Sequence, residues 1–146
     1  MATGVFDLLH LGHIHYLEEA KKLGDELVVV VATDKTARER KHEPITPQDM
    51  RLAMIRSLKP VDRAVLGKEG DIYEIVKEIK PDIIALGFDQ AHDSDKIARD
   101  LKERGIQAKV VRLPEFDHDL SGSRKIMKKV IDWYIVQEKL KKVEEK

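Results

Sequence analysis

Short runs of β-branched and other apolar residues recur along the chain and constrain its fold most strongly. Residues 26–32 (ELVVVVA) are too short for an isolated helix and are apolar on both faces, as expected of a parallel strand buried between two layers of helices. Residues 1–6, 61–67, 81–87 and 108–113 have the same character. Together these segments predict a sheet of parallel strands.

Helical patterns separate the strand segments. The first helix is predicted to begin at His13 and to end near Gly24, and Thr46-Pro47-Gln48-Asp49 is typical of a capping box that opens the second. Further helices are predicted over residues 71–80, over 93–104 and from Ser121 towards the C-terminus. Because strands and helices alternate throughout, we expect a single α/β domain, residues 1–146, with a doubly wound parallel sheet.

The composition limits the kinds of partner. The 27 basic and 27 acidic residues cancel, which argues against a large electrostatic footprint for nucleic acid. No apolar run approaches the roughly 20 residues of a membrane span, and the N-terminus has no secretory-signal pattern. The chain contains no cysteine, which excludes disulfides, thiolate metal sites and cysteine nucleophiles. We therefore expect a cytoplasmic protein that binds neither nucleic acid nor a membrane.

Three histidines lie within residues 6–17, FDLLHLGHIHYL. His10 and His13 follow the first predicted strand, at the sheet edge where ligands bind, and at a helix N-terminus that favours an anion. Gly12 lets a ligand approach the backbone closely. The chain contains neither a G-x-G-x-x-G motif nor a P-loop, so this turn is predicted to bind phosphate. A metal site is the alternative, but no convincing third ligand is evident, so no metal ligand is assigned; His15 is interpreted as a structural residue of the helix face.

The stretch GVFDLLHLGH, residues 4–13, resembles the G-T-F-D-x-x-H-x-G-H signature of the nucleotidyltransferase superfamily that contains the cytidylyltransferases. Residues 120–126, LSGSRKI, are similar to the second signature of that superfamily, a Ser/Thr-rich turn before the last helix. The chain departs from these patterns at Val5, which replaces the usual threonine, and at Gly122 within the Ser-rich turn. The resemblance implies a Rossmann-like nucleotidyltransferase fold.

Within this superfamily the chain is most similar to the archaeal type of FAD synthase, over nearly its whole length. The segments GDELVVVVATD, KPVDRAVLG and KPDIIALGFDQ carry the similarity. It implies an enzyme that joins ATP and FMN to give FAD and pyrophosphate, with a divalent metal cation, Mg²⁺ or similar, bound with the nucleotide. The residues that it implies for ATP binding are Val5, Phe6, His10, Leu11, Gly12 and His13, with Asp89 near the nucleoside and Phe116 lining the same pocket.

Nucleotidyl transfer is an in-line attack at the α-phosphorus, and fixed donors and cations supply most of its catalysis. His10 and His13 are the predicted catalytic donors. Residues 36–42 are expected to form either an ordinary charged loop or a lid that brings Lys41, a third catalytic candidate, onto the phosphates. Arg51 either assists phosphate binding or forms a surface ion pair. The helix that begins at Ser121 and Ser123 offers amides and hydroxyls to the leaving phosphates.

The main alternative function is that of a glycerol-3-phosphate cytidylyltransferase-like enzyme that makes a CDP-alcohol from CTP, because the histidine motif reads phosphates and not the base. A sugar-phosphate adenylyltransferase and a nucleotide-binding regulator without catalysis are further alternatives. No general base is evident in the sequence. A phosphate acceptor needs none, since its second pKa of about 6 leaves it largely ionised at neutral pH; this favours FMN.

The last predicted helix carries more apolar residues than one small sheet needs to cover. Together with the family resemblance, this predicts a homodimer; packing of these residues onto their own domain is the alternative. The apolar residues are Ile126, Val130, Trp133, Ile135, Val136, Leu140 and Val143.

Overall fold

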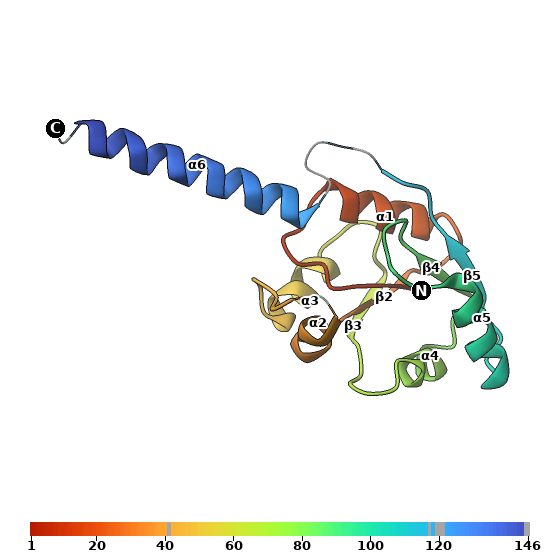
Figure 1. Cartoon of the computed structure of the whole chain (residues 1–146). Helices are drawn as coiled ribbons and strands as arrows, with labels where there is room; N and C mark the ends of the chain where they lie inside the picture. Colours follow the sequence, from red (N-terminus) through yellow and green to blue (C-terminus); the bar gives the residue numbers. More distant parts are fainter. Residues whose placement is uncertain (41, 117, 119–121, 145–146) are drawn as a thin grey trace.

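A computed structural model describes residues 1–40, 42–116, 118 and 122–144 (Figure 1). Its five strands are parallel and lie in the order β3-β2-β1-β4-β5. Their bounds are β1 Ala2–Gly4, β2 Val28–Val31, β3 Arg63–Leu66, β4 Ile83–Leu86 and β5 Lys109–Arg112. All five predicted strands are therefore confirmed. Strand order reverses between β1 and β4, which is where ligands bind in sheets of this kind.

Helices cover both faces of the sheet, as Figure 1 shows for α1 and α4. The helices are α1 Leu11–Lys21, α2 Asp34–Arg40, α3 Gln48–Arg56, α4 Tyr73–Ile79, α5 Ser94–Glu103 and α6 Ser123–Glu144. Consecutive valines of β2 serve two cores: Val29 and Val31 pack with α1 and α3, whereas Val30 packs with α4 and α5. This double burial explains the continuous apolar run, and it confirms the doubly wound α/β fold.

The segment after β2 differs from its prediction. Residues 36–40 belong to helix α2 and not to a loop. The hydroxyl of Thr33 accepts a hydrogen bond from the amide of Thr36 at 3.2 Å, and Ala37 is buried. Asp34 in the first turn and the arginines of the last turn complement the helix dipole. The predicted lid residue, Lys41, lies outside the described residues.

Two helix starts also differ from prediction. Helix α1 begins at Leu11 with His10 as its N-cap, so His13 lies in the first turn. Helix α3 has no side-chain cap, and the capping-box prediction is wrong. The hydroxyl of Thr46 donates instead to the carboxylate of Asp7 at 2.6 Å. Pro47 occupies the N-cap position of α3, and the Thr46 side chain is directed to the histidine turn.

Helix α6 extends away from the sheet (Figure 1). Its 22 residues span about 33 Å at 1.5 Å per residue. Seven of its large apolar side chains are exposed: Val130, Ile131, Trp133, Tyr134, Ile135, Val136 and Leu140. These side chains do not pack onto their own domain, which was the alternative left open by the sequence. Within the described ranges, none of the helices is both long and apolar enough to cross a membrane.

Candidate active site

The turn between β1 and α1 is strained. Phe6 and Leu8 have φ angles of 56° and 50°, a region that bulky residues rarely occupy. Phe6 is buried, and its ring folds back over Gly4, where an added Cβ would lie 2.8 Å from the ring atom Cζ. Gly4 is therefore needed because it leaves room for the Phe6 ring.

The two histidines of the motif form a stacked pair at the start of α1. Their ring centroids lie 3.7 Å apart with an interplanar angle of 24°. The ring of Phe6 contacts His13 edge to face, with centroids 5.5 Å apart. Both imidazoles are half-buried, and Nδ1 of His10 is buried without a hydrogen-bond partner. The pair therefore has a fixed geometry beside the free amides of a helix N-terminus.

Burial also affects the charge of His10. Desolvation lowers the pKa of His10 below its ordinary value, although the nearby carboxylate of Asp89 opposes this shift. A lowered pKa favours the neutral imidazole at neutral pH, which keeps one ring N–H as a donor. Asp89, which follows β4 across the switch point from β1, is thus near enough to His10 to affect its charge.

Asp7 links the histidine turn to two other segments. Its carboxylate accepts hydrogen bonds from the amides of Ile45 (2.7 Å) and Thr46 (3.0 Å) and from the Thr46 hydroxyl. Its carbonyl accepts one from the Ser123 hydroxyl at 2.7 Å. Burial opposes ionisation, but the Thr46 and Ile45 hydrogen bonds and the charge of Arg51 hold the pKa of Asp7 below its ordinary value. Asp7 was not predicted to have a role, although it is part of the FD pair in the motif.

Arg51 is completely buried. Its Nη1 donates to the carbonyls of Val5 (2.6 Å) and Ala32 (2.9 Å), which follow β1 and β2. Its Nε donates to the carbonyl of Thr46, and its Nη2 pairs with Asp34 at 2.7 Å. The ion pair that the sequence suggested is therefore present, but it lies inside the protein and not on its surface.

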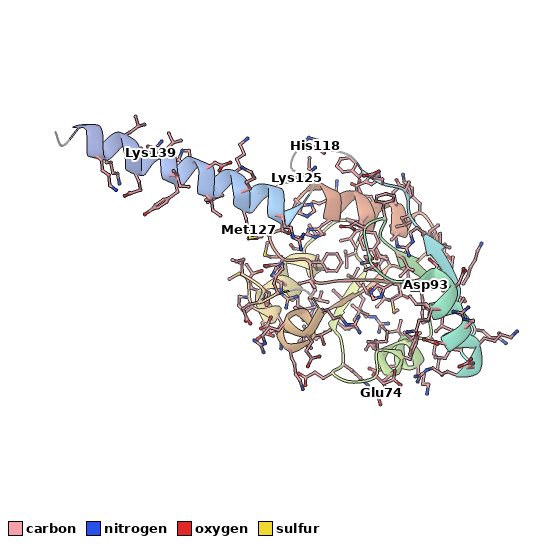
Figure 2. All side chains as sticks on the ribbon, viewed as in Figure 1. Glu74, Asp93, His118, Lys125, Met127 and Lys139 are labelled. Carbon is pink, nitrogen blue, oxygen red and sulfur yellow. The ribbon has the colours of Figure 1, made fainter. Side chains whose placement is uncertain are left out.

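The other predicted site residues differ in how they relate to the histidine pair. Leu11 and Gly12 lie in the first turn of α1, beside the histidines. The ring of Phe116 stacks on that of His15, with centroids 4.6 Å apart. His15 is the histidine that was interpreted as a structural residue of the helix face. Near it, Lys125 donates to the carbonyl of His118, which joins this segment to α6 (Figure 2). Ser121 lies outside the described residues.

The strand ends are joined across the switch point by uncharged groups. The side chain of Gln90 donates to the carbonyl of Thr3 at 2.7 Å and accepts from the amide of Gly87. The Tyr16 hydroxyl donates to the carbonyl of Ala85 at 2.9 Å. Neither Gln90 nor Tyr16 was predicted, because hydrogen bonds between distant strand ends leave no local pattern in a sequence.

The donor side chains near the histidine turn limit how a metal ion could bind. In the part of the chain that the structure describes, no group of three or more His, Asp or Glu side chains could hold a metal ion. Mg²⁺, however, usually takes one or two carboxylates and completes its shell with water and substrate phosphates. Asp89 beside the histidines fits that second mode of binding.

The chain is similar to known proteins over nearly its whole length. The model of the cytidylyltransferase-like family matches residues 1–143. The chain is 56% identical to the FAD synthase of Aciduliprofundum boonei over 133 residues, covering 90% of this chain and 89% of that protein. It is 47% identical to the FAD synthase of Archaeoglobus profundus over 146 residues, covering 99% and 92%.

A solved structure is similar as well. The crystal structure described as the lipopolysaccharide core biosynthesis protein of Thermoplasma volcanium GSS1 is 58% identical, with a TM-score of 0.79. The match covers 80% of this chain and 96% of that one. The FAD synthase of Thermoplasma volcanium is 54% identical over 132 residues, which are 90% of this chain and 93% of that protein.

Proposed function

The chain belongs to the cytidylyltransferase-like family and, within it, to the FAD synthases, and we propose that the histidine turn is where it transfers AMP from ATP to FMN. The observation that carries this proposal is the stacked pair of His10 and His13 at the N-terminus of α1. This arrangement would offer imidazole donors and the first backbone amides of α1 to a polyphosphate at the switch point.

The reaction needs little covalent help from the protein. An oxygen of the FMN phosphate attacks the α-phosphorus of ATP, and the bond from that phosphorus to the bridging oxygen breaks. Pyrophosphate leaves with the electron pair of that bond. Charge grows on the phosphate oxygens during the transfer, so the two imidazoles and the amides of α1 act as fixed donors in the transition state. The attacking phosphate is largely ionised at neutral pH and requires no general base.

Asp7 and Arg51 act as positioning residues in this proposal. Arg51 turns the carbonyl oxygens of Val5 and Ala32 towards itself, which keeps their partial negative charge away from a bound polyphosphate. Asp7 holds the segment before α3 and the first turn of α6 against the histidine turn. Ser123 would then lie close to the phosphates, and Lys41 and Ser121 remain proposed contributors.

A divalent cation, Mg²⁺ or similar, is proposed to arrive with the triphosphate. When bound, it neutralises charge on the phosphate oxygens. Asp89 would contribute a carboxylate to it beside the nucleoside, while Val5, Phe6, Leu11 and Gly12 would border the nucleotide through their backbone. Phe116 remains a proposed wall of the same region.

We also propose that the protein is a homodimer formed through α6. Over residues 130–136 the exposed apolar side chains lie on several sides of the helix, and a helix that is apolar on most sides is normally buried. A second copy offers the same surface, so the contact would be a two-fold, self-complementary one. The chain has no net formal charge to oppose association.

Product analysis tests the proposed reaction. The enzyme is incubated with ATP, Mg²⁺ and FMN, and in parallel with CTP, Mg²⁺ and glycerol 3-phosphate. FAD and pyrophosphate are expected in the first mixture. CDP-glycerol in the second mixture, with no FAD in the first, would overturn the proposal in favour of the cytidylyltransferase alternative.

A further inference from the structure

A cavity of about 700 Å³ opens beside the histidine turn. Four of its lining residues follow the carboxyl ends of neighbouring strands: Val5, Ala32, Gly67 and Gln90. The histidines belong to α1, which packs with the core on one face of the sheet; this cavity reaches into the core on the other face, under α4 and α5. Val5 belongs to both places, because it lines the cavity and leads into the histidine turn.

The inner part of the cavity is apolar. Its walls come from both the sheet and the two helices: Val30, Ile84, Leu86, Ile75, Val76 and Ile97. Tyr73 adds an aromatic ring whose hydroxyl is already engaged, since it donates to Asp100 at 2.8 Å. A slot of this kind suits a flat aromatic group that makes few hydrogen bonds at its buried end.

The outer part of the cavity is charged. Arg40 of α2, Lys68 after β3 and Lys96 of α5 line it. The two carboxylates that also line it have partners in the fold: Asp93, at the start of α5 in Figure 2, accepts the amides of Asp95 and Lys96, and Asp100 accepts the Tyr73 hydroxyl. Lys68 is paired with Glu78, which does not line the cavity, so Arg40 and Lys96 are the cations that favour an anionic group at the mouth.

We propose that this cavity binds the acceptor of the reaction, with the flavin ring of FMN in the apolar slot and its phosphate at the cationic mouth. This inference rests on the proposed function. An in-line transfer needs the attacking phosphate and the leaving pyrophosphate on opposite sides of the α-phosphorus. In this proposal the histidine turn holds the ATP phosphates on one side of Val5. The cavity holds the attacking FMN phosphate on the other side. Its volume lies within the range of about 300–1,000 Å³ of small-molecule sites.

A bulky residue at the mouth tests the assignment. Ala91 is exposed and lines the cavity, whereas Ala98 is exposed on α5 and does not line it. Ala91→Trp is expected to raise both the Kd for FMN, measured by quenching of flavin fluorescence without ATP, and the KM for FMN by about tenfold or more. The KM for ATP should change by less than about twofold. Ala98→Trp, the matched control, should leave all three constants unchanged.

A charge reversal tests the mouth without adding bulk. Lys96→Glu should weaken FMN more than riboflavin, which has the ring but no phosphate, and Lys102→Glu on the same helix, outside the cavity, should weaken neither. An unchanged Kd for FMN in both Ala91→Trp and Lys96→Glu would overturn the assignment. So would a rise in the KM for ATP alone, which would place the adenine here. In either case, FAD formation by the unaltered enzyme would show that the proposed function itself survives.

Discussion

The ring of Phe6 meets the imidazole of His13 edge to face, at 65° and with centroids 5.5 Å apart. This contact continues a line of packing that begins at Gly4, which the Phe6 ring covers, and ends at His10, which stacks on His13. The strained φ of Phe6 is maintained because its ring is buried in this line. The orientation of the histidine pair therefore depends on a residue that carries no polar group.

Replacing His13 with alanine should lower kcat by about 10²–10³, the scale for the loss of one transition-state donor, and leave the fold intact. Steady-state rates of FAD formation and thermal unfolding measure the two effects. Lys102→Ala is the control, because Lys102 is exposed on α5 and lines neither the histidine turn nor the cavity beside it. Near-normal activity of His13→Ala, or one equivalent of tightly bound zinc in the refolded wild-type protein, would contradict the phosphate role of the pair.

Gly4→Ala should both destabilise the protein and slow the reaction. The new Cβ would lie 2.8 Å from a buried ring that is held by His13 and Tyr16, so the overpacking should cost about 1–3 kcal/mol and displace His13. Denaturant unfolding and kcat are the measurements. Gly24→Ala is the matched control, since nothing lies within 4 Å of its Cβ position; equal behaviour of the two variants would show that the Phe6 ring moves freely.

Asp7 should make stability depend on pH. Its pKa in the folded protein lies below its ordinary value of 3.8, so the folded state binds fewer protons than the unfolded state. The stabilisation is thus complete above about pH 5 and is lost as the pH falls through the folded pKa. Asp7→Asn should cost about 1–3 kcal/mol at pH 7 and flatten the acid limb of the unfolding curve. Asp25→Asn, an exposed control, should do neither.

Trp133→Glu should convert a dimer into a monomer, because it places a charge at the centre of the exposed apolar surface of α6. Multi-angle light scattering at micromolar concentration measures the mass. Lys139→Glu changes an exposed residue of the same helix (Figure 2) and should remain dimeric. A monomeric mass for the unaltered protein would reject the dimer.

The sheet was predictable because each strand is a short run of apolar residues that stays buried on both faces. The position of His10 and His13 at the start of α1 was predictable from their motif. Helix α2 was missed because five of its seven residues are charged and only Ala37 marks its inner face. The burial of Arg51 was not predictable either: a charged residue near a helix start suggests a solvent-exposed side chain, and its acceptors come from three separate segments.

The contacts of Arg51 also bear on how the molecule opens. Its guanidinium joins the ends of β1 and β2 to the segment before α3 and to α2, so none of these pieces can detach without leaving a charge unpaired in the interior, at a cost of several kcal/mol. Amide hydrogen exchange in this edge of the sheet should therefore proceed only through a large cooperative opening, and not by fraying of single segments. The ends of β1 and β2 beside the proposed nucleotide site would then remain rigid while other segments around that site move.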